Sequence, residues 1–372
     1  MGIIIPALII IFSSILIWKS SNIFEISSLY LGRNLTDGVR GATINAISSS
    51  LPELLATLFF LILLKDSEGF IGGLGTTAGS AVFNSLLIPM LCILFVIIYN
   101  NTKAIEYSSK IIYRDGIALL IAEIILIITL SNNNLFWWHG AILMITYFGY
   151  LTFIFITMKI NKEENTYRLE IDFETKRKMT LSDKTKFILL LDFHKILLND
   201  KIINNRKAII LLFTSLFVMT ISTFILVFAC ELLSSDTYTL IGSVEFKGLG
   251  LSISVISILI ASAATSVPDT IISIKDAKRG NADDAISNAY GSNIFDICFA
   301  LGLPLFLYCL FNGPIPLNGF NLRSAIDIRF SLLLITFLSL IVMVWGKKAG
   351  YLKALMLLLL YLGFIWFVIF RV

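Results

Sequence analysis

Charged residues, histidine and cysteine are all scarce in this chain of 372 residues. Only 15% of the residues are charged, against roughly 25% in an ordinary soluble domain, while 57% are hydrophobic. This composition excludes a soluble globular protein. The two histidines are far apart and the four cysteines are scattered singly through apolar stretches, so no metal-ligand or disulfide spacing is present. The cysteines, which we interpret as small core residues, are Cys92, Cys230, Cys298 and Cys309.

A strong surplus of one charge is also missing. The 29 Lys and Arg residues against 25 Asp and Glu give a net charge of +4, which is too small to indicate nucleic acid as a partner. No basic stretch precedes the apolar N-terminal run, and Pro6 stands where a myristoylation signal has Ser or Thr. We therefore expect neither a cleaved signal peptide nor a lipid anchor.

Long apolar runs are abundant instead. A helix needs about 20 residues to cross a hydrocarbon core, so the runs predict an all-α polytopic membrane protein with about ten transmembrane helices. Residues 1–158 form a first five-helix half, 159–207 a charged linker with 20 of the chain's 54 charges, and 208–372 a second five-helix half. The runs lie at about 3–17 (continuing towards Leu31), 41–64, 71–99, 116–130, 136–158, 208–233, 249–274, 285–311, 325–345 and 350–370.

Basic residues in the connections predict the orientation of these helices. The odd-numbered connections, which include the linker, hold 23 Lys and Arg residues, and the even-numbered connections hold four. Because cytoplasmic loops carry the excess of positive charge, the odd connections and the 159–207 linker are predicted to be cytoplasmic and both termini extracytoplasmic. The linker is short and holds no evident regulatory domain, which suggests a compact membrane protein of a prokaryotic cytoplasmic membrane.

Two motifs occur in both halves and in the same order. Residues 79–84 (GSAVFN) recur at 291–296 (GSNIFD), and 49–53 (SSLPE) recur at 265–269 (TSVPD). The copies, at about 41–87 and 261–304, start five spans apart. Since five is odd, one copy is upside down relative to the other. Inverted-topology repeats of this kind are typical of transporters that work by alternating access.

Each repeat places a carboxylate directly after a proline in an apolar helix, at Glu53 and Asp269. Proline cannot donate the helical hydrogen bond, so we expect carbonyl oxygens near Ser49 and Thr265 to be free for a ligand. Hydroxyl and carboxylate stand four residues apart and so share a helix face. Ser80 with Asn84 and Ser292 with Asp296 repeat this spacing. The neutral serines Ser50 and Ser266 directly follow Ser49 and Thr265.

All of these donors are hard oxygens, so the expected ligand is a hard cation such as calcium, sodium or potassium. An acid within a membrane helix is costly and usually functional, whereas a hydroxyl there more commonly packs or bonds to its own helix. Repetition raises the serines above that expectation. Glu25, Glu123 and Glu231 have no repeat partner and are interpreted as local pairs near helix ends, and the glycines Gly72, Gly73, Gly75, Gly79 and Gly291 as sites of close helix approach.

At these residues the chain resembles the cation/calcium exchanger superfamily, whose repeats carry G-T-S-[LV]-P-[ED] and G-S-x-x-x-[ND] motifs. Within it, residues 75–84 and 266–296 look most like the potassium-dependent sodium/calcium branch. The resemblance implies an antiporter that exchanges calcium for sodium, with no cofactor, no protein partner and only small cations and the lipid bilayer as contacts. It implies Glu53 and Asp269 as paired calcium ligands, with the carbonyls of Ser49 and Thr265. The residues that it implies to complete the calcium and sodium sites are Ser50, Ser80, Asn84, Ser266, Ser292 and Asp296.

By this resemblance, Asp296 matches the position that is linked to potassium use in the potassium-dependent branch. Glu53, Asp269 and Asp296 carry three negative charges, which three sodium ions, or one calcium with one potassium, would neutralise. The chain departs from the motif where Ser48-Ser49 replaces Gly-Thr and where Ala263-Ala264 precedes Thr265, so the site geometry is expected to differ.

Other functions remain open from the residues alone. Buried carboxylates also bind protons, so a proton-coupled calcium antiporter is the alternative within this class. A cation channel could use the same ligands, although inverted repeats favour a transporter. An intramembrane aspartyl protease would need two acids for acid and base catalysis, but the Gly-x-Gly-Asp motif of that class is missing.

Overall fold

The computed structural model describes residues 2–32, 44, 46–158, 204–239, 244–346 and 348–372. Most of the predicted linker and the start of the first predicted repeat therefore lie outside the described residues. The first half contains α1 (Ile4–Leu31), α3 (Ala46–Leu64), α4 (Asp66–Tyr99), α5 (Ser109–Thr129) and α6 (Trp137–Met158). The second half contains α9 (Asn205–Ser234), α10 (Ile253–Ile256), α11 (Ser262–Thr265), α12 (Val267–Lys278), α13 (Ala282–Phe295), α14 (Gly302–Asn312), α15 (Gly319–Val344) and α16 (Tyr351–Arg371), with π-helical turns η2 (Ser257–Ala261) and η3 (Asp296–Ala300).

The helices confirm an all-α membrane protein. Among the described residues, eight helices are long and apolar enough to span a membrane, and the series α10 to α12, bent by 45°, makes a ninth. The tenth predicted span is α5, which has 21 residues but includes Arg114, Asp115 and Glu123. These charged side chains make α5 more polar than the simple apolar span that we expected, and it packs against α13 and α15.

Two short antiparallel sheets join the halves in a symmetric way. Strand β1 (Ile105–Glu106), before α5, pairs with β6 (Lys348–Ala349), before α16. Strand β2 (Asn134–Leu135), before α6, pairs with β5 (Ile315–Pro316), before α15. Helices α5 and α15 are the fourth helices of their halves, and α6 and α16 are the fifth. Each sheet therefore pairs the strand before a fourth helix with the strand before the fifth helix of the other half. This exchange is what a two-fold relation between inverted halves produces.

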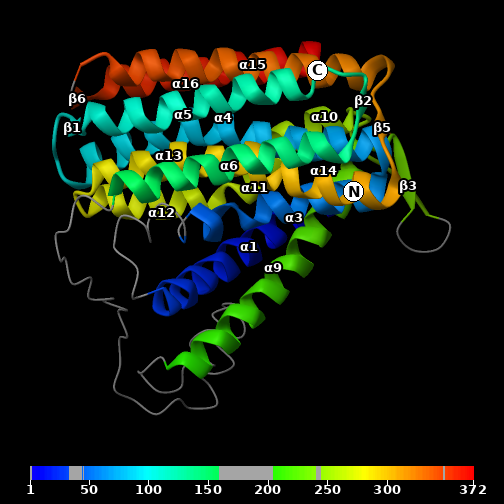
Figure 1. Ribbon diagram of the computed structural model, residues 1–372, viewed down its shortest axis with the longest axis horizontal. Coiled ribbons are helices and arrows are strands. Elements are labelled where there is room, and N and C mark those ends of the chain that lie inside the picture. The colour runs from blue at the N-terminus through cyan, green and yellow to red at the C-terminus, as the bar shows by residue number, and fades with distance from the viewer. Residues whose placement is uncertain (1, 33–43, 45, 159–203, 240–243, 347) are drawn as a thin grey trace.

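Both chain ends lie at one end of the molecule. Figure 1 shows β1 and β6 at the left, and β2, β5 and both termini at the right. The hairpin of β3 (Thr237–Thr239) and β4 (Glu245–Lys247) is also at the right. There Tyr238 donates to the Gly2 carbonyl, and Ser254 donates to the Val372 carbonyl at 3.2 Å. The connections that contain β1 and β6 are therefore separated from those that contain β2, β3, β4 and β5, as a chain that crosses the membrane at every helix requires.

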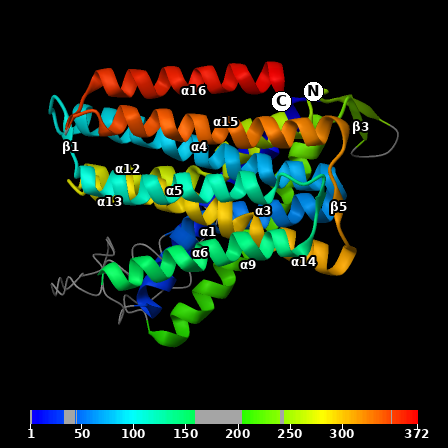
Figure 2. The same ribbon diagram turned by 45° about the horizontal axis from the view of Figure 1, so that its top comes forward.

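The helices are arranged around a buried centre. Helices α3, α4, α12 and α13 lie inside, α1 and α9 pack together along one side, and α5, α6, α15 and α16 cover the others (Figures 1 and 2). One large apolar cluster fills the body of the molecule, and a separate one joins α1 and α9 to α3 and α10. All four cysteines are free and buried, as predicted.

Glycine lets α4 approach the bent helix closely. A Cβ on Gly79 would lie 2.4 Å from the Ile258 carbonyl oxygen, and one on Gly75 would lie 2.1 Å from the Ser257 hydroxyl. The prediction of close approach is confirmed for these two residues, and for Gly72 and Gly73, where a Cβ would lie 2.6 Å from side chains of α3. It is wrong for Gly291, where a Cβ would meet only the Tyr150 hydroxyl at 3.9 Å.

Candidate cation-binding site

The proline of the first repeat does not break its helix. Pro52 lies inside α3, which continues from Ala46 to Leu64. The carbonyl that loses its helical donor to Pro52 belongs to Ser48, four residues earlier. It accepts a hydrogen bond of 2.8 Å from the Ser21 hydroxyl on α1. The expected free carbonyl in this repeat is therefore occupied by a neighbouring helix and lies at Ser48.

The second repeat is broken as the sequence predicts. The axis bends by 45° between α11 and α12, at Ser266, and Pro268 stands in the first turn of α12. This places Asp269 in that first turn, where the helix dipole favours a negative charge. The π-helical turn η3 begins at Asp296, whose carbonyl accepts from the Leu301 amide at 3.1 Å. The same proline motif therefore lies in a continuous helix in the first repeat and beside a bend in the second.

The structure brings all of the predicted site residues into one buried region. Every one of them is fully buried, with 0% of its surface exposed. Helix α3 supplies Ser49, Ser50 and Glu53; α4 supplies Ser80 and Asn84; the bent helix supplies Thr265, Ser266 and Asp269; and α13 with η3 supplies Ser292 and Asp296.

Ser80 is the first point at which the two repeats meet. Its hydroxyl oxygen lies 3.2 Å from Oε1 of Glu53 and 3.0 Å from Oδ2 of Asp296, and it accepts from the Ser266 hydroxyl at 2.8 Å. A hydroxyl has one proton, so it can donate to only one of the two carboxylates at a time. The other carboxylate oxygen needs a further positive partner.

Asn84 is the second such point. Its side-chain nitrogen lies 3.3 Å from Oδ2 of Asp269, 3.3 Å from the Ser292 hydroxyl and 3.4 Å from the Ser80 hydroxyl. The amide therefore points its donors at the second repeat. Its oxygen, Oδ1, is buried and has no hydrogen-bonding partner among the described residues.

The remaining hydroxyls also cross between the repeats. Thr265 of the second repeat lies beside the Glu53 carboxylate, and Ser49 of the first repeat lies beside the Asp269 carboxylate. Ser50 lies beside Asp296. Each carboxylate thus lies beside at least one hydroxyl from the opposite half.

Several oxygen atoms in this region are left without a partner. Within the described residues, five buried side-chain oxygens of the site accept or donate no hydrogen bond. Burying a polar atom without a partner is unfavourable, so such atoms are rare and indicate a ligand site when they cluster. They are Glu53 Oε2, Asp269 Oδ1, Asp296 Oδ1, Asn84 Oδ1 and Ser50 Oγ.

Within the described residues, no Lys or Arg side chain forms an ion pair with an acid of the site. In the described part of the chain the two ion pairs are Arg114 with Asp115 and Lys348 with Glu106. The second pair is exposed, and the hydrogen bond from Lys348 lowers the pKa of Glu106. The described residues also contain no cluster of three His, Cys, Asp or Glu residues placed as a compact metal cage. Six of the ten candidate residues supply hydroxyl groups and one, Asn84, supplies an amide.

Two asparagines near the site were missed in the sequence. Asn288 lies beside Asp269 and donates to the Ser273 hydroxyl at 3.1 Å. Asn293 donates to the Ala81 carbonyl at 3.0 Å and so ties α13 to α4. The spacing of Asn288, Ser292 and a third polar residue at 296 follows one helix face and could have indicated the first of them.

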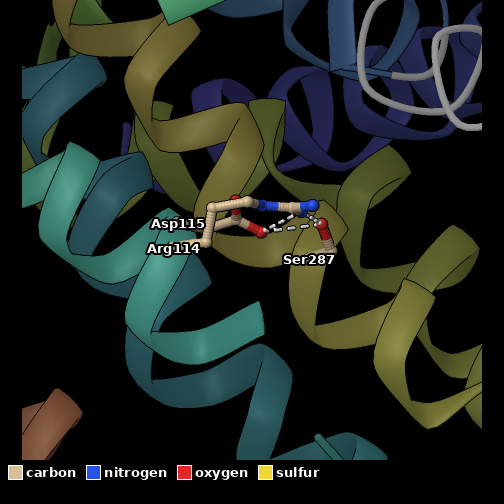
Figure 3. A network of polar contacts seen from close by, with 3 residues as sticks. All are labelled: Arg114, Asp115 and Ser287. Atoms are coloured by element: carbon tan, nitrogen blue, oxygen red, sulfur yellow. Dashed lines mark hydrogen bonds and ion pairs between the residues drawn. The ribbon is translucent and has the colours of Figure 1, made fainter. Parts of the chain in front are cut away.

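A polar network holds α13 against α5. Figure 3 shows the Arg114 guanidinium, the Asp115 carboxylate and the Ser287 hydroxyl in mutual contact. Arg114 Nε lies 2.6 Å from Asp115 Oδ1, and Ser287 donates to Asp115 Oδ2 at 2.8 Å. Since Ser287 precedes Ser292 on the same helix, this network positions the helix that carries part of the candidate site.

Glu123 differs from its predicted role. It lies within α5 at 0% exposure and accepts a hydrogen bond of 2.6 Å from Thr336 on α15. The interpretation as a local pair near a helix end is wrong for this residue, because its partner is a neutral hydroxyl in the interior of another helix. Its second oxygen has no partner among the described residues.

Comparisons with known proteins agree with this arrangement. A family model described as sodium/calcium exchanger protein matches residues 5–156 and 207–370. Sodium/potassium/calcium exchanger 5 of Homo sapiens is 28% identical over 395 residues, which cover 91% of this chain and 76% of that protein. Sodium/potassium/calcium exchanger 1 of Gallus gallus is 39% identical over 99 residues, which cover 26% of this chain and 15% of that protein.

Solved structures share the fold. The sodium-calcium exchanger NCX_Mj, soaked with sodium and strontium, has a TM-score of 0.57 at 20% identity, covering 98% of this chain and 99% of that one. The H+/Ca2+ exchanger CAX has a TM-score of 0.63 at 14% identity, covering 98% and 81%. At these identities the likeness establishes the helical architecture with its two repeats.

Proposed function

The chain belongs to the sodium/calcium exchanger family, and from this premise we propose that it is a secondary active antiporter that exchanges calcium for sodium across the membrane. The transported cations bind where the two repeats meet, at the site formed by Glu53, Asp269 and Asp296 with their hydroxyl and amide neighbours. Alternating access then exposes this one site to each side of the membrane in turn.

One observation carries the proposal: five buried side-chain oxygens without partners come from both repeats, whose acids Ser80 and Asn84 link by hydrogen bonds. Carboxylate, amide and hydroxyl oxygens are the ligands of calcium and sodium, and their number suits a calcium shell of six to eight oxygens completed by carbonyls or water. A bound cation would compensate three carboxylates that no Lys or Arg of the described residues pairs with.

Charge balance leads to the proposed loads. Three ionised carboxylates are neutralised by three sodium ions, or by one calcium with one potassium. We therefore propose that potassium moves with calcium and that Asp296 is the residue on which this depends. Sodium/potassium/calcium exchangers among the similar proteins support this choice.

The orientation follows from the two ends of the molecule. We propose that the end with β1 and β6 faces the cytoplasm with the 159–207 linker, and that the end with both termini faces outward, in a prokaryotic cytoplasmic membrane. Single cysteines at Asn101 and Asn133, both exposed and at opposite ends, test this. Impermeant maleimide added outside intact cells should label the Asn133→Cys protein only, and labelling of the Asn101→Cys protein only would reverse the orientation.

Transport in proteoliposomes tests the function. Calcium-45 uptake should require an outward sodium gradient, increase with external potassium and be lost in Glu53→Gln. Glu123→Gln, which removes an equally buried acid outside the site, is the matched control and should transport. In Asp296→Asn the stimulation by potassium should disappear.

Each arm can contradict one part of the proposal. Uptake driven by a pH gradient instead of sodium would make the protein a proton-coupled antiporter. Calcium flux that needs no counter-ion would make it a channel. Unchanged potassium dependence in Asp296→Asn would remove potassium from the mechanism.

A further inference from the structure

Helices α1 and α9 occupy equivalent places in the two halves. Over the eleven residues that end at Ser21 in α1 and at Thr223 in α9, the degree of burial matches at ten positions. Within them Ser20 and Ser222 are both buried, and each hydroxyl donates at 2.7 Å to the carbonyl four residues earlier in its own helix. This alignment makes Thr223 the counterpart of Ser21.

The two counterparts differ in what their hydroxyls contact. The Ser21 hydroxyl donates at 2.8 Å to the Ser48 carbonyl, which Pro52 deprives of its helical donor. The Thr223 hydroxyl is fully buried and has no partner among the described residues. A buried hydroxyl without a partner is unfavourable in a membrane helix, so a partner for Thr223 is expected in another state of the protein.

The repeat itself identifies that partner. Pro268 is the counterpart of Pro52, so the carbonyl equivalent to that of Ser48 belongs to Ala264, four residues before Pro268. Ala264 packs in one buried cluster with Leu226 and Val227 of α9, one turn after Thr223. Ala264 therefore shares a cluster with residues that follow Thr223 by three and four positions in α9.

We propose that Ser21 and Thr223 are alternating positioning residues. Each donates to the carbonyl that a proline frees beside the candidate cation site: Ser21 to Ser48 in the state described here, and Thr223 to Ala264 in the opposite state. When the two halves exchange conformations, one hydrogen bond breaks as the other forms. The bond that is made holds α1 to α3, or α9 to α11, and so selects which half takes each conformation.

The proposal rests on the antiport function only in assuming alternating access, and a distance measurement tests it without any transport. Spin labels at Leu8 of α1 and Ile62 of α3, which are 61% and 53% exposed, report how these helices lie. The native cysteines are buried and do not compete for the label. Double electron–electron resonance on the full chain in lipid then gives the populations of the two arrangements.

Single variants should shift these populations in opposite directions. Ser21→Ala should lower the ratio of the described state to the other state about three-fold, the effect of an average interhelical hydrogen bond in a membrane. Thr223→Val should raise the ratio by a similar factor. Ser21→Thr and Thr223→Ser keep the hydroxyl and should restore the ratio of the parent protein.

Matched controls separate positioning from general weakening of the fold. Ser20→Ala and Ser222→Ala remove the neighbouring hydroxyls, which bond within their own helices, and should leave the ratio unchanged. A ratio that Ser21→Ala and Thr223→Val leave unchanged, or move in the same direction, overturns the proposal. If the parent protein transports no calcium but the two variants still shift the ratio of states in opposite directions, only the proposed function is contradicted.

Discussion

Ser80 and Asn84 connect the two repeats at the level of single residues. Ser80 touches the carboxylates of Glu53 and Asp296, and Asn84 touches that of Asp269. Because one hydroxyl proton cannot satisfy two carboxylates, the site needs a further hydrogen-bond donor or a cation. Protons compete with calcium for the same oxygens, so calcium binding is expected to weaken as the pH falls.

At the scale of single residues, replacing Arg114 should destabilise the protein more than replacing its partner Asp115. The Asp115 side chain is 1% exposed and that of Arg114 is 26% exposed. Arg114→Leu leaves a buried carboxylate without its cation and should destabilise the protein by about 3 kcal/mol. Asp115→Asn should cost less, because the amide oxygen still accepts from Ser287 and the guanidinium reaches solvent.

Thermal unfolding of the purified protein checks this order. Arg323→Leu, at an exposed arginine of α15, is the control and should change the unfolding temperature little. An Asp115→Asn protein less stable than the Arg114→Leu protein would contradict the account of the network in Figure 3.

The candidate ligands could be predicted because each occurs in a repeated motif. Glu53 and Asp269 follow equivalent prolines, and that repetition is visible in a single sequence. Asn288 could not be predicted in this way, since its counterpart in the first repeat is Thr76, whose hydroxyl bonds to the Gly72 carbonyl in its own helix. Contacts that one half makes and the other does not leave no repeated signal.

At the scale of helices, the same proline has two outcomes. Pro52 lies in a continuous α3, while Pro268 follows a bend of 45°. Ser21 satisfies the freed carbonyl in the first case, which removes one cause of bending. The sequence predicts that a carbonyl loses its donor, but the choice between a bend and a replacement donor depends on the neighbouring helix.

Glycine substitutions should separate two equivalent positions. Gly79→Ala places a methyl group 2.4 Å from a backbone oxygen of the bent helix, so it should destabilise the protein by about 1 to 3 kcal/mol and reduce transport. Gly291→Ala meets only a hydroxyl at 3.9 Å and replaces a helical glycine, so stability should stay the same or rise by up to about 1 kcal/mol.

The two proteins should be compared by unfolding temperature and by calcium uptake, with the unsubstituted protein as reference. Equal losses of stability and calcium uptake in the two proteins would show that the motif glycine is needed for the helix backbone itself. That result would contradict the close-approach explanation at Gly79.

At the scale of the whole molecule, the halves exchange their connections at both ends. The pairing of β1 with β6 and of β2 with β5 relates the fourth helix of one half to the fifth of the other. The spans and their separation into odd and even connections could be predicted from hydropathy and charge. The pairing of the connections could not, because each sheet has only two residues per strand and no sequence pattern marks so short a strand.

Calcium binding to the purified protein at equilibrium tests most directly whether the two repeats form one cation site. We expect one calcium-45 ion to bind per chain and sodium to displace it. Glu53→Gln and Asp269→Asn should each abolish binding, while Glu123→Gln should retain it. Calcium that still binds to the Glu53→Gln and Asp269→Asn proteins, or that sodium does not displace, would contradict a shared site between the repeats.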